Sequence, residues 1–310
     1  MIKLNPTDNK SKAPGSMKFS KVRPYIYLLP AFIVLALFVL KPFWFAIEKS
    51  FYRYDGVQIN EFIGLDNYKR LFTDTVFYKS MGNMVFFMIF MVIKFTFPII
   101  AAELIVNIQK ERLQSKFQLA FTIPMVIPSV ITLLVWKFFY YPGIGVFANI
   151  LKLFGMSPLD IPLFLGDENL VKIFISMIGF PWIPGLEFLI AYAALKNIDK
   201  SLIEATVIDG CSKFKRVFYL DLPYIMPQIK TLLALCIIGC IQNYENIFIL
   251  TQGGPNNASL VPGLYMYNVS FVPNGTSESL YGYACTMSLV LFAVSFILSA
   301  IVMRDKSEKV

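Results

Sequence analysis

Polar side chains gather at one point of a long apolar segment in the last quarter of the chain. Five consecutive residues there carry amide, phenol or carboxyl groups: Gln242, Asn243, Tyr244, Glu245 and Asn246. Amides and carboxylates beside an aromatic ring are groups that hydrogen-bond the hydroxyls of a sugar or another polyhydroxy ligand. If the segment is one helix, Gln242, Glu245 and Asn246 share a face, because they are spaced i, i+3 and i+4.

Three further polar residues lie in other apolar segments: Ser129, Thr132 and Glu187. The hydroxyl of Ser129 has an alternative use, because it follows a proline and can bond a backbone carbonyl that the proline frees. A carboxylate such as Glu187 must be paired or hydrated in apolar surroundings. All these residues are candidates for a substrate path. The alternative, that they only join helices by hydrogen bonds, stays open. Two charged residues, Lys94 and Glu103, have no assigned role.

Enzymatic chemistry is not expected of this chain. It has no histidine, the commonest general base, and its 4 cysteines show no C-x-x-C spacing. The phosphate-binding motif G-x-x-x-x-G-K-[S/T] does not occur either. We therefore predict no catalytic residue, no metal site, and no cofactor or nucleotide site in this chain.

The composition indicates a membrane protein. Hydrophobic residues make up 56% of the 310 positions and charged residues 15%, with a mean hydropathy of +0.61. The apolar residues form blocks of roughly 20 to 25, the length of a helix that crosses a bilayer. We predict an all-α membrane protein with about six transmembrane helices. Their approximate bounds are residues 25–47, 83–108, 119–140, 171–195, 228–250 and 281–303.

Prolines are expected to interrupt three of these helices. Pro98 lies in the second, Pro124 and Pro128 lie in the third, and Pro181 and Pro184 lie in the fourth. We expect the fourth helix to be kinked or broken. Outside the transmembrane domain at 24–303, residues 1–23 and 304–310 are predicted to be polar tails.

The distribution of positive charge predicts the orientation of the chain. Of the 28 Lys and Arg residues, about 18 lie in the two tails, the connection around residue 112 and the loop at 196–227. The loop at 251–280 contains none. Both termini and the loop at 196–227 are therefore predicted to be cytoplasmic. Topology also explains the net charge of +8, so no nucleic-acid partner is expected.

A short amphipathic helix is predicted inside the loop at 196–227. Ser201 and Glu204 have the spacing of a capping box, and Gly210 is the residue type that commonly ends a helix. Leu202 and Ile208 fall on one face. A helix of roughly ten residues is too short to be stable alone in water, so it needs a partner surface. That surface is either another protein or the membrane interface, on which the helix would lie passively.

Several motifs follow one another along the chain. Glu204-Ala-Thr, Asp209-Gly and Leu222-Pro, in this order, resemble the EAA loop of binding-protein-dependent ABC transporter permeases. Gly64-Leu-Asp-Asn-Tyr68 and Leu250-Thr-Gln-Gly-Gly-Pro255 resemble the carbohydrate-uptake branch of that family. The resemblance covers nearly the whole chain. It departs from the usual pattern only in small residues, with threonine and cysteine where alanine is usual after Ala205 and Gly210.

The resemblance implies a division of labour between subunits. In that family the EAA loop forms a coupling helix that docks in a groove of a cytoplasmic ATPase, which assigns this role to Glu204, Ala205, Asp209 and Gly210. An ATPase dimer would bind the ATP and Mg²⁺. The other implied partners are a second homologous permease subunit, an extracellular substrate-binding protein and the lipid bilayer, here the cytoplasmic membrane of a bacterium. The sugar site of maltose-type permeases draws on the part of the fifth helix that holds residues 242–246.

The sequence therefore predicts the permease subunit of an ATP-driven importer for an oligosaccharide or sugar. Alternative substrates are glycerol-3-phosphate-like or other polyhydroxy solutes, although the apolar segments hold no arginine cluster that favours a phosphate. A passive channel or ion-coupled carrier would leave the amphipathic helix of the loop without a role. A membrane enzyme would need a nucleophile paired with a base, which the sequence does not offer.

Overall fold

The structure is a computed structural model that describes residues 14–183, 185–271 and 280–304. Almost all of its regular structure is helical. The described residues also include one short antiparallel pair of strands, in which Tyr52 lies opposite Phe62. The elements in chain order are α1 (Pro14–Leu35), η1 (Ala36–Leu40), α2 (Lys41–Lys49), β1 (Tyr52–Tyr54), β2 (Asn60–Phe62), α3 (Asp66–Thr73), α4 (Thr75–Val106), α5 (Glu111–Thr122), η2 (Ile123–Val126), α6 (Ser129–Phe139), α7 (Val146–Leu153), α8 (Val171–Met177), α9 (Gly185–Lys196), α10 (Lys200–Ile208), α11 (Lys213–Arg216), η3 (Val217–Asp221), α12 (Leu222–Gln242), α13 (Glu245–Leu250), α14 (Pro262–Phe271) and α15 (Tyr281–Met303).

Long apolar helices confirm the membrane character of the chain. Within the described residues, 4 helices are long and apolar enough to cross a bilayer. They are Pro24–Lys49, Thr75–Val106, Lys213–Gln242 and Tyr281–Met303. The pair Glu111–Val126 and Ser129–Phe139 meets the same criterion when taken together, but it is bent by 91°. The described chain therefore offers 4 candidate spans, or up to 5 if the bent pair is one span, and the sixth stays a prediction.

The predicted helix bounds hold best at the C-terminal end. The sixth predicted helix coincides with α15. Residues 14–23, expected to be part of a tail, are helical, and the remainder of the predicted tails at 1–13 and 305–310 lies outside the described residues. The second predicted helix begins earlier than expected, at Thr75, because the Asp74 side chain accepts hydrogen bonds from the backbone N–H groups of Val76 and Phe77. It also continues through Pro98 without interruption.

Prolines interrupt the third and fourth predicted helices, as expected. In the third, the segment that contains Pro124 and Pro128 turns the chain by 91° between η2 and α6. The fourth was expected to be kinked or broken, and this is confirmed, because α8 ends at Met177 and α9 begins at Gly185. Neither α8, with 7 residues, nor α9, with 12, is long enough to cross a bilayer alone.

The bounds of the fifth predicted helix are wrong at both ends. Helical structure begins at Lys213, passes through a π-helical turn at η3 and continues in α12. It stops at Gln242, and a separate short helix, α13, follows from Glu245. Residues 242–246 therefore lie at a break between helices. The periodicity of apolar residues does not reveal such a break, because the break is stabilised by contacts with other side chains.

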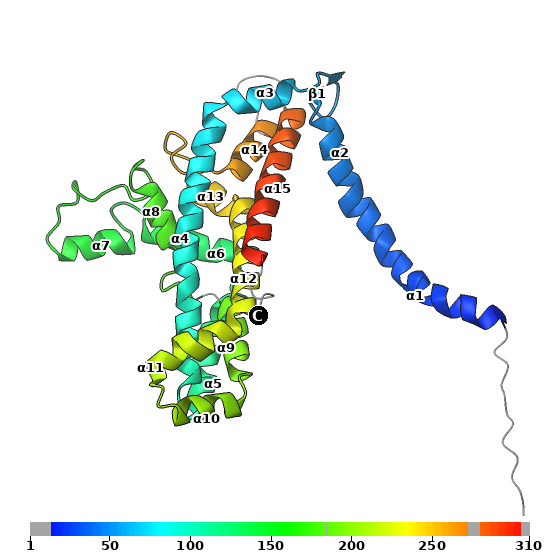
Figure 1. Cartoon of the computed structure of the whole chain (residues 1–310). Helices are drawn as coiled ribbons and strands as arrows, with labels where there is room; N and C mark the ends of the chain where they lie inside the picture. The colour runs from blue at the N-terminus through cyan, green and yellow to red at the C-terminus, as the bar shows by residue number, and fades with distance from the viewer. Residues whose placement is uncertain (1–13, 184, 272–279, 305–310) are drawn as a thin grey trace, which may run out of the picture.

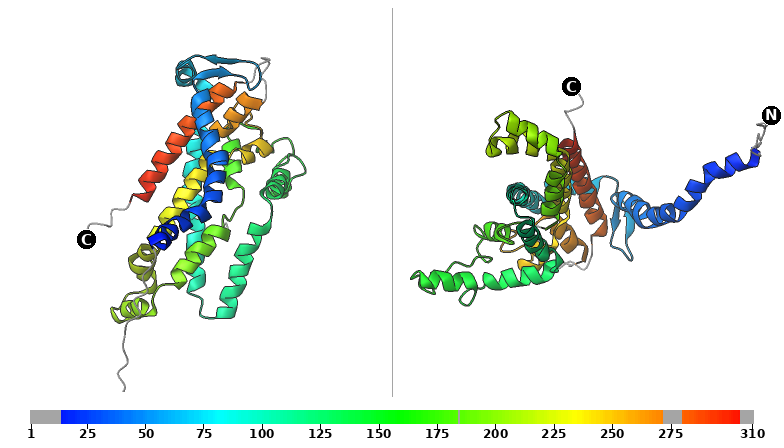
Figure 2. Two further views of the ribbon diagram at one scale, coloured as in Figure 1. Left: turned by 90° about the vertical axis from the view of Figure 1, so that its right-hand side faces the viewer. Right: turned by 90° about the horizontal axis from the view of Figure 1, so that it is seen from below.

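The helices α4, α12 and α15 lie together along the length of the molecule (Figure 1). We call the end with β1, β2 and α3 the hairpin end, and the opposite end, with α10 and α11, the α10 end. The first residues of α1 and the last residues of α15 are the ends of these helices that point away from the hairpin end (Figure 1). The right-hand view of Figure 2 shows α1 leaving the bundle, and the apolar window of 18 residues in the first span is 0% buried.

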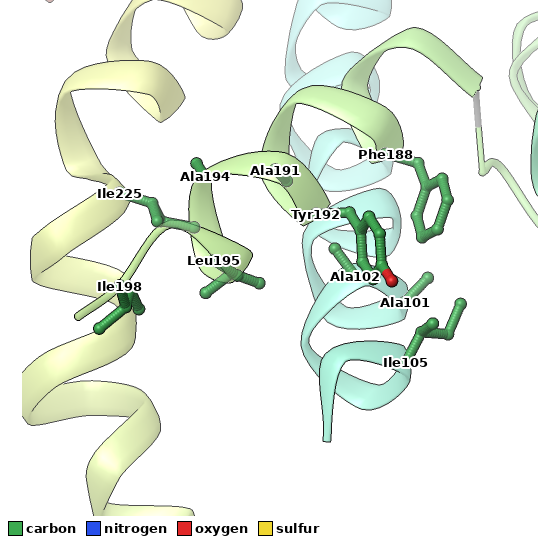
Figure 3. Packing of buried hydrophobic residues seen from close by; sticks show 10 residues of the cluster. All are labelled: Ala101, Ala102, Ile105, Phe188, Ala191, Tyr192, Ala194, Leu195, Ile198 and Ile225. Atoms are coloured by element: carbon green, nitrogen blue, oxygen red, sulfur yellow. The ribbon is translucent and has the colours of Figure 1, made fainter. Parts of the chain in front are cut away.

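The core toward the α10 end consists of α4 and α9 packed against each other (Figure 3). Alanines on both helices allow a close approach, which is how helices in a membrane gain packing energy. Phe188 and Tyr192 fill the space beside them with rings 5.8 Å apart. The buried residues of this cluster are Ala101, Ala102, Ile105, Phe188, Ala191, Tyr192, Ala194, Leu195, Ile198 and Ile225.

The Gly64-Leu-Asp-Asn-Tyr68 motif fixes the hairpin end. The buried Asn67 amide donates to the backbone carbonyls of Ser50 and Tyr52, at 2.9 Å each. Thr286 of α15 donates to the same Ser50 carbonyl at 3.2 Å. Gly282 of α15 must be glycine, because a Cβ there would lie 2.0 Å from the Tyr52 oxygen. The motif therefore joins the first and last spans through backbone groups.

Asp74 joins three helices at the same end. Its Oδ2 accepts hydrogen bonds from the hydroxyls of Tyr265 in α14 and Tyr283 in α15, both at 2.6 Å. Burial alone would raise the pKa of the Asp74 carboxyl, but the two phenol bonds and the N–H groups of Phe77 and Val76 outweigh it and hold the pKa below the ordinary value of 3.8.

The pKa of Asp74 predicts an acid-dependent contribution to stability. A carboxyl whose pKa is lowered by folding stabilises the folded state above its unfolded pKa and loses this effect as the pH falls through the folded pKa. Asp74→Asn should therefore lower the melting temperature of the detergent-solubilised protein at about pH 6, and the difference from wild type should shrink toward about pH 3. Asp66→Asn, at an exposed surface pair with Lys69, is the control. A difference that stays constant with pH would contradict this role.

Candidate functional site

The amphipathic helix predicted in the loop is present as α10. It starts at Lys200 after Asp199, without a side-chain cap, so the predicted capping box of Ser201 and Glu204 is wrong. Ser201 already lies inside the helix, where its oxygen is not needed as a cap. Asp199 has extended backbone and its carbonyl accepts the first helical bonds, from Leu202 at 3.0 Å and Ile203 at 3.3 Å.

The end of α10 at Gly210 follows the prediction. Gly210 has a positive φ of 70°, and its N–H bonds the Val207 carbonyl at 3.1 Å. The next N–H, of Cys211, bonds the Thr206 carbonyl at 2.9 Å. These two bonds form a Schellman motif, which requires the left-handed conformation that glycine adopts without strain. A Cβ at Gly210 would meet nothing within 4 Å, so the backbone angle, and not the available space, requires glycine in this chain.

One face of α10 packs on the chain and the other is exposed. Ile203 packs against the core of α4 and α9, and Thr206 is half-buried beside it. The four residues predicted to contact an ATPase, Glu204, Ala205, Asp209 and Gly210, are all exposed. Two large apolar side chains accompany them, Val207 at 67% and Ile208 at 85% exposure. The helix therefore combines a fixed inner side with an unpartnered apolar outer side.

A charged network holds the segment after α10 to the end of α4. Arg216 forms an ion pair with the buried Asp221 at 2.9 Å and lies 3.9 Å from Glu103. It also donates to Asn107 at 2.6 Å, and Asn107 donates to Glu103 at 2.7 Å. This network explains Glu103, which had no assigned role in the sequence. It ties η3, at the start of the long helix that includes α12, to α4.

Residues 242–246 lie at the break between α12 and α13. Asn243 leaves the helical conformation, with φ −79° and ψ 97°, and its side-chain oxygen accepts from the Asn246 N–H at 3.4 Å. The ring of Tyr244 stacks on Tyr267 of α14, with centroids 5.5 Å apart. Because no helix runs through these residues, the predicted common face of Gln242, Glu245 and Asn246 does not exist. The break nevertheless gathers their side chains around one hollow.

Three open hollows follow one another along α12. The amide hollow, of about 600 Å³, is lined by Ser129, Gly239, Gln242, Asn243, Tyr244, Glu245, Asn246, Phe248 and Tyr267. The lysine hollow, of about 470 Å³, shares Gly239, Asn243 and Asn246 with it and is also lined by Lys94, Ser176 and Glu187. The tryptophan hollow, of about 360 Å³, shares Met91, Lys94, Glu187 and Cys236 with the lysine hollow and includes Trp182. Shared walls make the three hollows a continuous row directed toward the α10 end.

The row contains most of the residues proposed for a substrate path. Ser129 and the five residues at the break line the amide hollow, and Glu187 lines the other two, where its Oε1 lies 3.7 Å from the Cys236 Sγ. Thr132 is half-buried and lines none of the three hollows described here. Sequence reasoning missed Lys94, Ser176 and Trp182. The signal for Lys94 was a charge inside an apolar helix, whereas Ser176 and Trp182 gave no signal.

The Leu250-Thr-Gln-Gly-Gly-Pro255 motif forms a loop that is hydrogen-bonded internally and to α4. Gly253 has φ 90°, and a Cβ there would lie 2.8 Å from Leu260. Ser259 bonds Thr251 and the Gly254 carbonyl, both at 2.7 Å. The amide of Asn83 in α4 donates to the carbonyls of residues 257 and 260, at 3.0 and 2.9 Å. The loop thus fixes α13 and α14 against α4.

Comparison with known proteins identifies the kind of protein that carries this row of hollows. A family model described as "Binding-protein-dependent transport system inner membrane component" matches residues 94–305. The chain belongs to this family. It is therefore a membrane-embedded permease of an ABC transporter, which confirms the interpretation of the EAA-loop motifs. The match includes α10, α12 and α13.

Relatives of this permease cover nearly the whole chain. The probable ABC transporter permease protein YurN of Bacillus subtilis is 26% identical over 92% of this chain and 96% of its own length. The lactose transport system permease protein LacF of Rhizobium radiobacter is 29% identical over 91% and 93%, respectively. The multiple sugar-binding transport system permease protein MsmF of Streptococcus mutans is 27% identical over 89% and 92%.

A solved structure has the same fold as this permease. The crystal structure of a bacterial ABC transporter involved in the import of the acidic polysaccharide alginate contains a chain that matches with a TM-score of 0.78 at 21% identity. The match covers 92% of this chain and 96% of that chain. At this level of identity the comparison establishes the fold alone.

The Arg216 network predicts a large effect of one substitution. Arg216→Gln leaves Asp221, whose side chain is 2% exposed, and Glu103, at 12%, without their cation. Removing one partner of a buried ion pair costs about 3–5 kcal/mol. The melting temperature of the purified permease should therefore fall, while Lys213→Gln, at an exposed position of the same segment, should change it little. A double variant with Asp221→Asn should recover part of the loss, and equal melting temperatures of Arg216→Gln and wild type would contradict the network.

Proposed function

We propose that this permease is one of two transmembrane subunits of an ATP-driven importer for an oligosaccharide or sugar delivered by an extracellular binding protein. The observation that carries the proposal is the two-sided α10, which is rooted in the core by Ile203 and exposes Val207, Ile208 and Glu204. An isolated helix of this length needs a partner surface. A passive interfacial helix would explain the apolar residues, but not the family motif.

The proposed partner of α10 is a cytoplasmic ATPase dimer that binds ATP and Mg²⁺. Val207 and Ile208 would enter a groove of the ATPase, while Glu204 and Asp209 fix the orientation. Movement of α10 would reach the transmembrane helices along two connections, Ile203 on the core and Arg216 on α4. These connections would rock the row of hollows between outward and inward access. The α10 end would then face the cytoplasm of a bacterial cell.

A second permease subunit would complete the path. All three hollows are open on one side, so this chain supplies only one wall. The apolar window of 18 residues in the span Pro24–Lys49 is 0% buried, and Leu153, Phe154 and Leu159 around α7 are at least 85% exposed. A homologous subunit and the lipid bilayer together would cover these surfaces. The termini would lie on the cytoplasmic side.

The proposed substrate class rests on the amide hollow. Amide and carboxylate groups of Gln242, Asn243 and Glu245 surround the stacked rings of Tyr244 and Tyr267. Such a set can bond sugar hydroxyls in several directions while the ring offers an apolar face. Names of the relatives, which include lactose and multiple-sugar permeases, support the same class.

A charge reversal on α10 tests the importer. Glu204→Lys should reduce ATP-dependent uptake into proteoliposomes at least about tenfold. If Glu204 faces a complementary group of the ATPase, the reversal places like charges opposite each other in the interface, which costs several kcal/mol. The ATPase subunit should also fail to copurify. Glu61→Lys, an exposed charge reversal at the hairpin end, should leave copurification of the ATPase intact. Normal uptake by Glu204→Lys with the ATPase still bound would refute the proposed docking.

An aromatic truncation tests the substrate class. Tyr244→Ala removes the ring that stacks on Tyr267 and should lower uptake of the saccharide that the binding protein delivers by roughly three- to tenfold. The ATPase should still copurify, because Tyr244 lies beyond the C-terminal end of α12, at the opposite end of this helix from α10 (Figure 1). Tyr141→Ala, at an exposed tyrosine outside the three hollows, is the control. If both substitutions reduce uptake equally, the amide hollow has no special role.

A further inference from the structure

The lysine hollow contains a cation that the rest of the structure does not use. Lys94 lies within α4, well inside the longest span, and lines both the lysine hollow and the tryptophan hollow. No carboxylate of the described residues lies within ion-pair distance of its ammonium, which is 5.5 Å from the centre of the Trp182 ring. Charged groups inside a membrane are expensive and usually serve a function.

An unpartnered hydroxyl lies in the same hollow. Ser176 of α8 is 2% exposed and lines the lysine hollow, yet its Oγ has no hydrogen-bond partner among the described residues. Buried polar groups are nearly always bonded to protein, water or ligand. A serine hydroxyl is a donor that suits an anionic oxygen, as an ammonium does. Lys94 and Ser176 therefore point to the same kind of ligand.

Two amides extend this set of donors. Asn243 and Asn246 line the lysine hollow and the amide hollow alike. The oxygen of Asn243 is already used to accept the Asn246 N–H, so the NH₂ group of Asn243 remains as a donor. A molecule that spans both hollows would thus meet Tyr244 and the carboxylate of Glu245 at one end and cationic and neutral donors at the other.

We infer that the lysine hollow is a subsite for a carboxylate group on the saccharide, so that the permease carries an acidic sugar. This inference rests on the proposed function and specifies its substrate class. A single ammonium matches the single charge of a carboxylate, whereas a doubly charged phosphate is usually bound by several cations. A volume of about 470 Å³ is within the usual range of ligand sites.

Glu187 limits how far the anion moves. It lines the lysine hollow and the tryptophan hollow, and it contacts Cys236, one helical turn nearer the α10 end than Cys240. Its negative charge repels a carboxylate that moves past Lys94. The proposed anion would therefore rest in the part of the lysine hollow away from Glu187, among Lys94, Ser176 and the two amides that it shares with the amide hollow.

Uptake by matched probes tests this subsite. Proteoliposomes with the complete importer are supplied with either a galacturonic acid disaccharide or the neutral galactose disaccharide of the same linkage. Wild type should take up the acidic probe, and Lys94→Gln should lower the acidic-to-neutral uptake ratio at least about tenfold. Lys94→Arg, which keeps the charge, should retain most of the ratio. Lys69→Gln, at an exposed lysine of α3, should leave the ratio unchanged. Ser176→Ala should lower it by a smaller factor.

The outcomes separate this inference from the proposed function. Uptake of the neutral probe with no uptake of the acidic probe would overturn the carboxylate subsite and leave the sugar importer standing. An unchanged ratio in Lys94→Gln, with the importer assembled in normal amount by gel filtration, would also overturn it. Failure of the acidic probe in an assembled wild-type importer would overturn this inference, whereas the proposed function is overturned by normal uptake in Glu204→Lys with the ATPase still bound.

Discussion

The close packing of α4 on α9 is the contact on which the rest of the molecule depends. Ala101 and Ala102 of α4 and Ala191 of α9 are buried in this contact (Figure 3), and such small side chains let two helices approach closely. On one side this pair supports α12 through Ile225, and at its end it supports α10 through Ile203. Because packed cores are not continuously deformable, a displacement of α10 in the proposed importer would be transmitted as a movement of whole helices.

Polar groups inside the protein divide into two kinds. Asn67, Asn83 and Asp74 each bind backbone or tyrosine groups and hold helices in place. Ser176 and Trp182 have buried polar atoms without a partner, and both line the row of hollows. The first kind concentrates toward the hairpin end, where the chain must be rigid. Two further buried atoms without a partner, Glu103 Oε2 and Ser299 Oγ, line none of the three hollows.

Features that depend on residues of one segment were predicted from the sequence, whereas features that depend on contacts with other side chains were not. Local rules sufficed for α15, for the positive φ of Gly210 and for the break between α8 and α9, because apolar length, glycine and proline act on their own segments. The break at Asn243 has no proline or glycine as a signal and depends on Asn243 bonding Asn246 and on Tyr244 stacking on Tyr267. Likewise, the position of Glu103 beside Arg216 depends on a contact between distant segments, whereas the missing capping box at Ser201 reflects a helix start shifted to Lys200.

The exposed part of the first span would make an unassembled copy of the permease easier to degrade. Residues 24–40 of this span are exposed, and only α2 packs on α15. A copy of the permease without the proposed partners would therefore keep a loosely held α1 and an apolar α10. Such a copy exposes more of its chain to membrane proteases than an assembled one. In the proposed importer, the number of complexes in the membrane would then be set by the scarcest subunit, because surplus permease would be degraded.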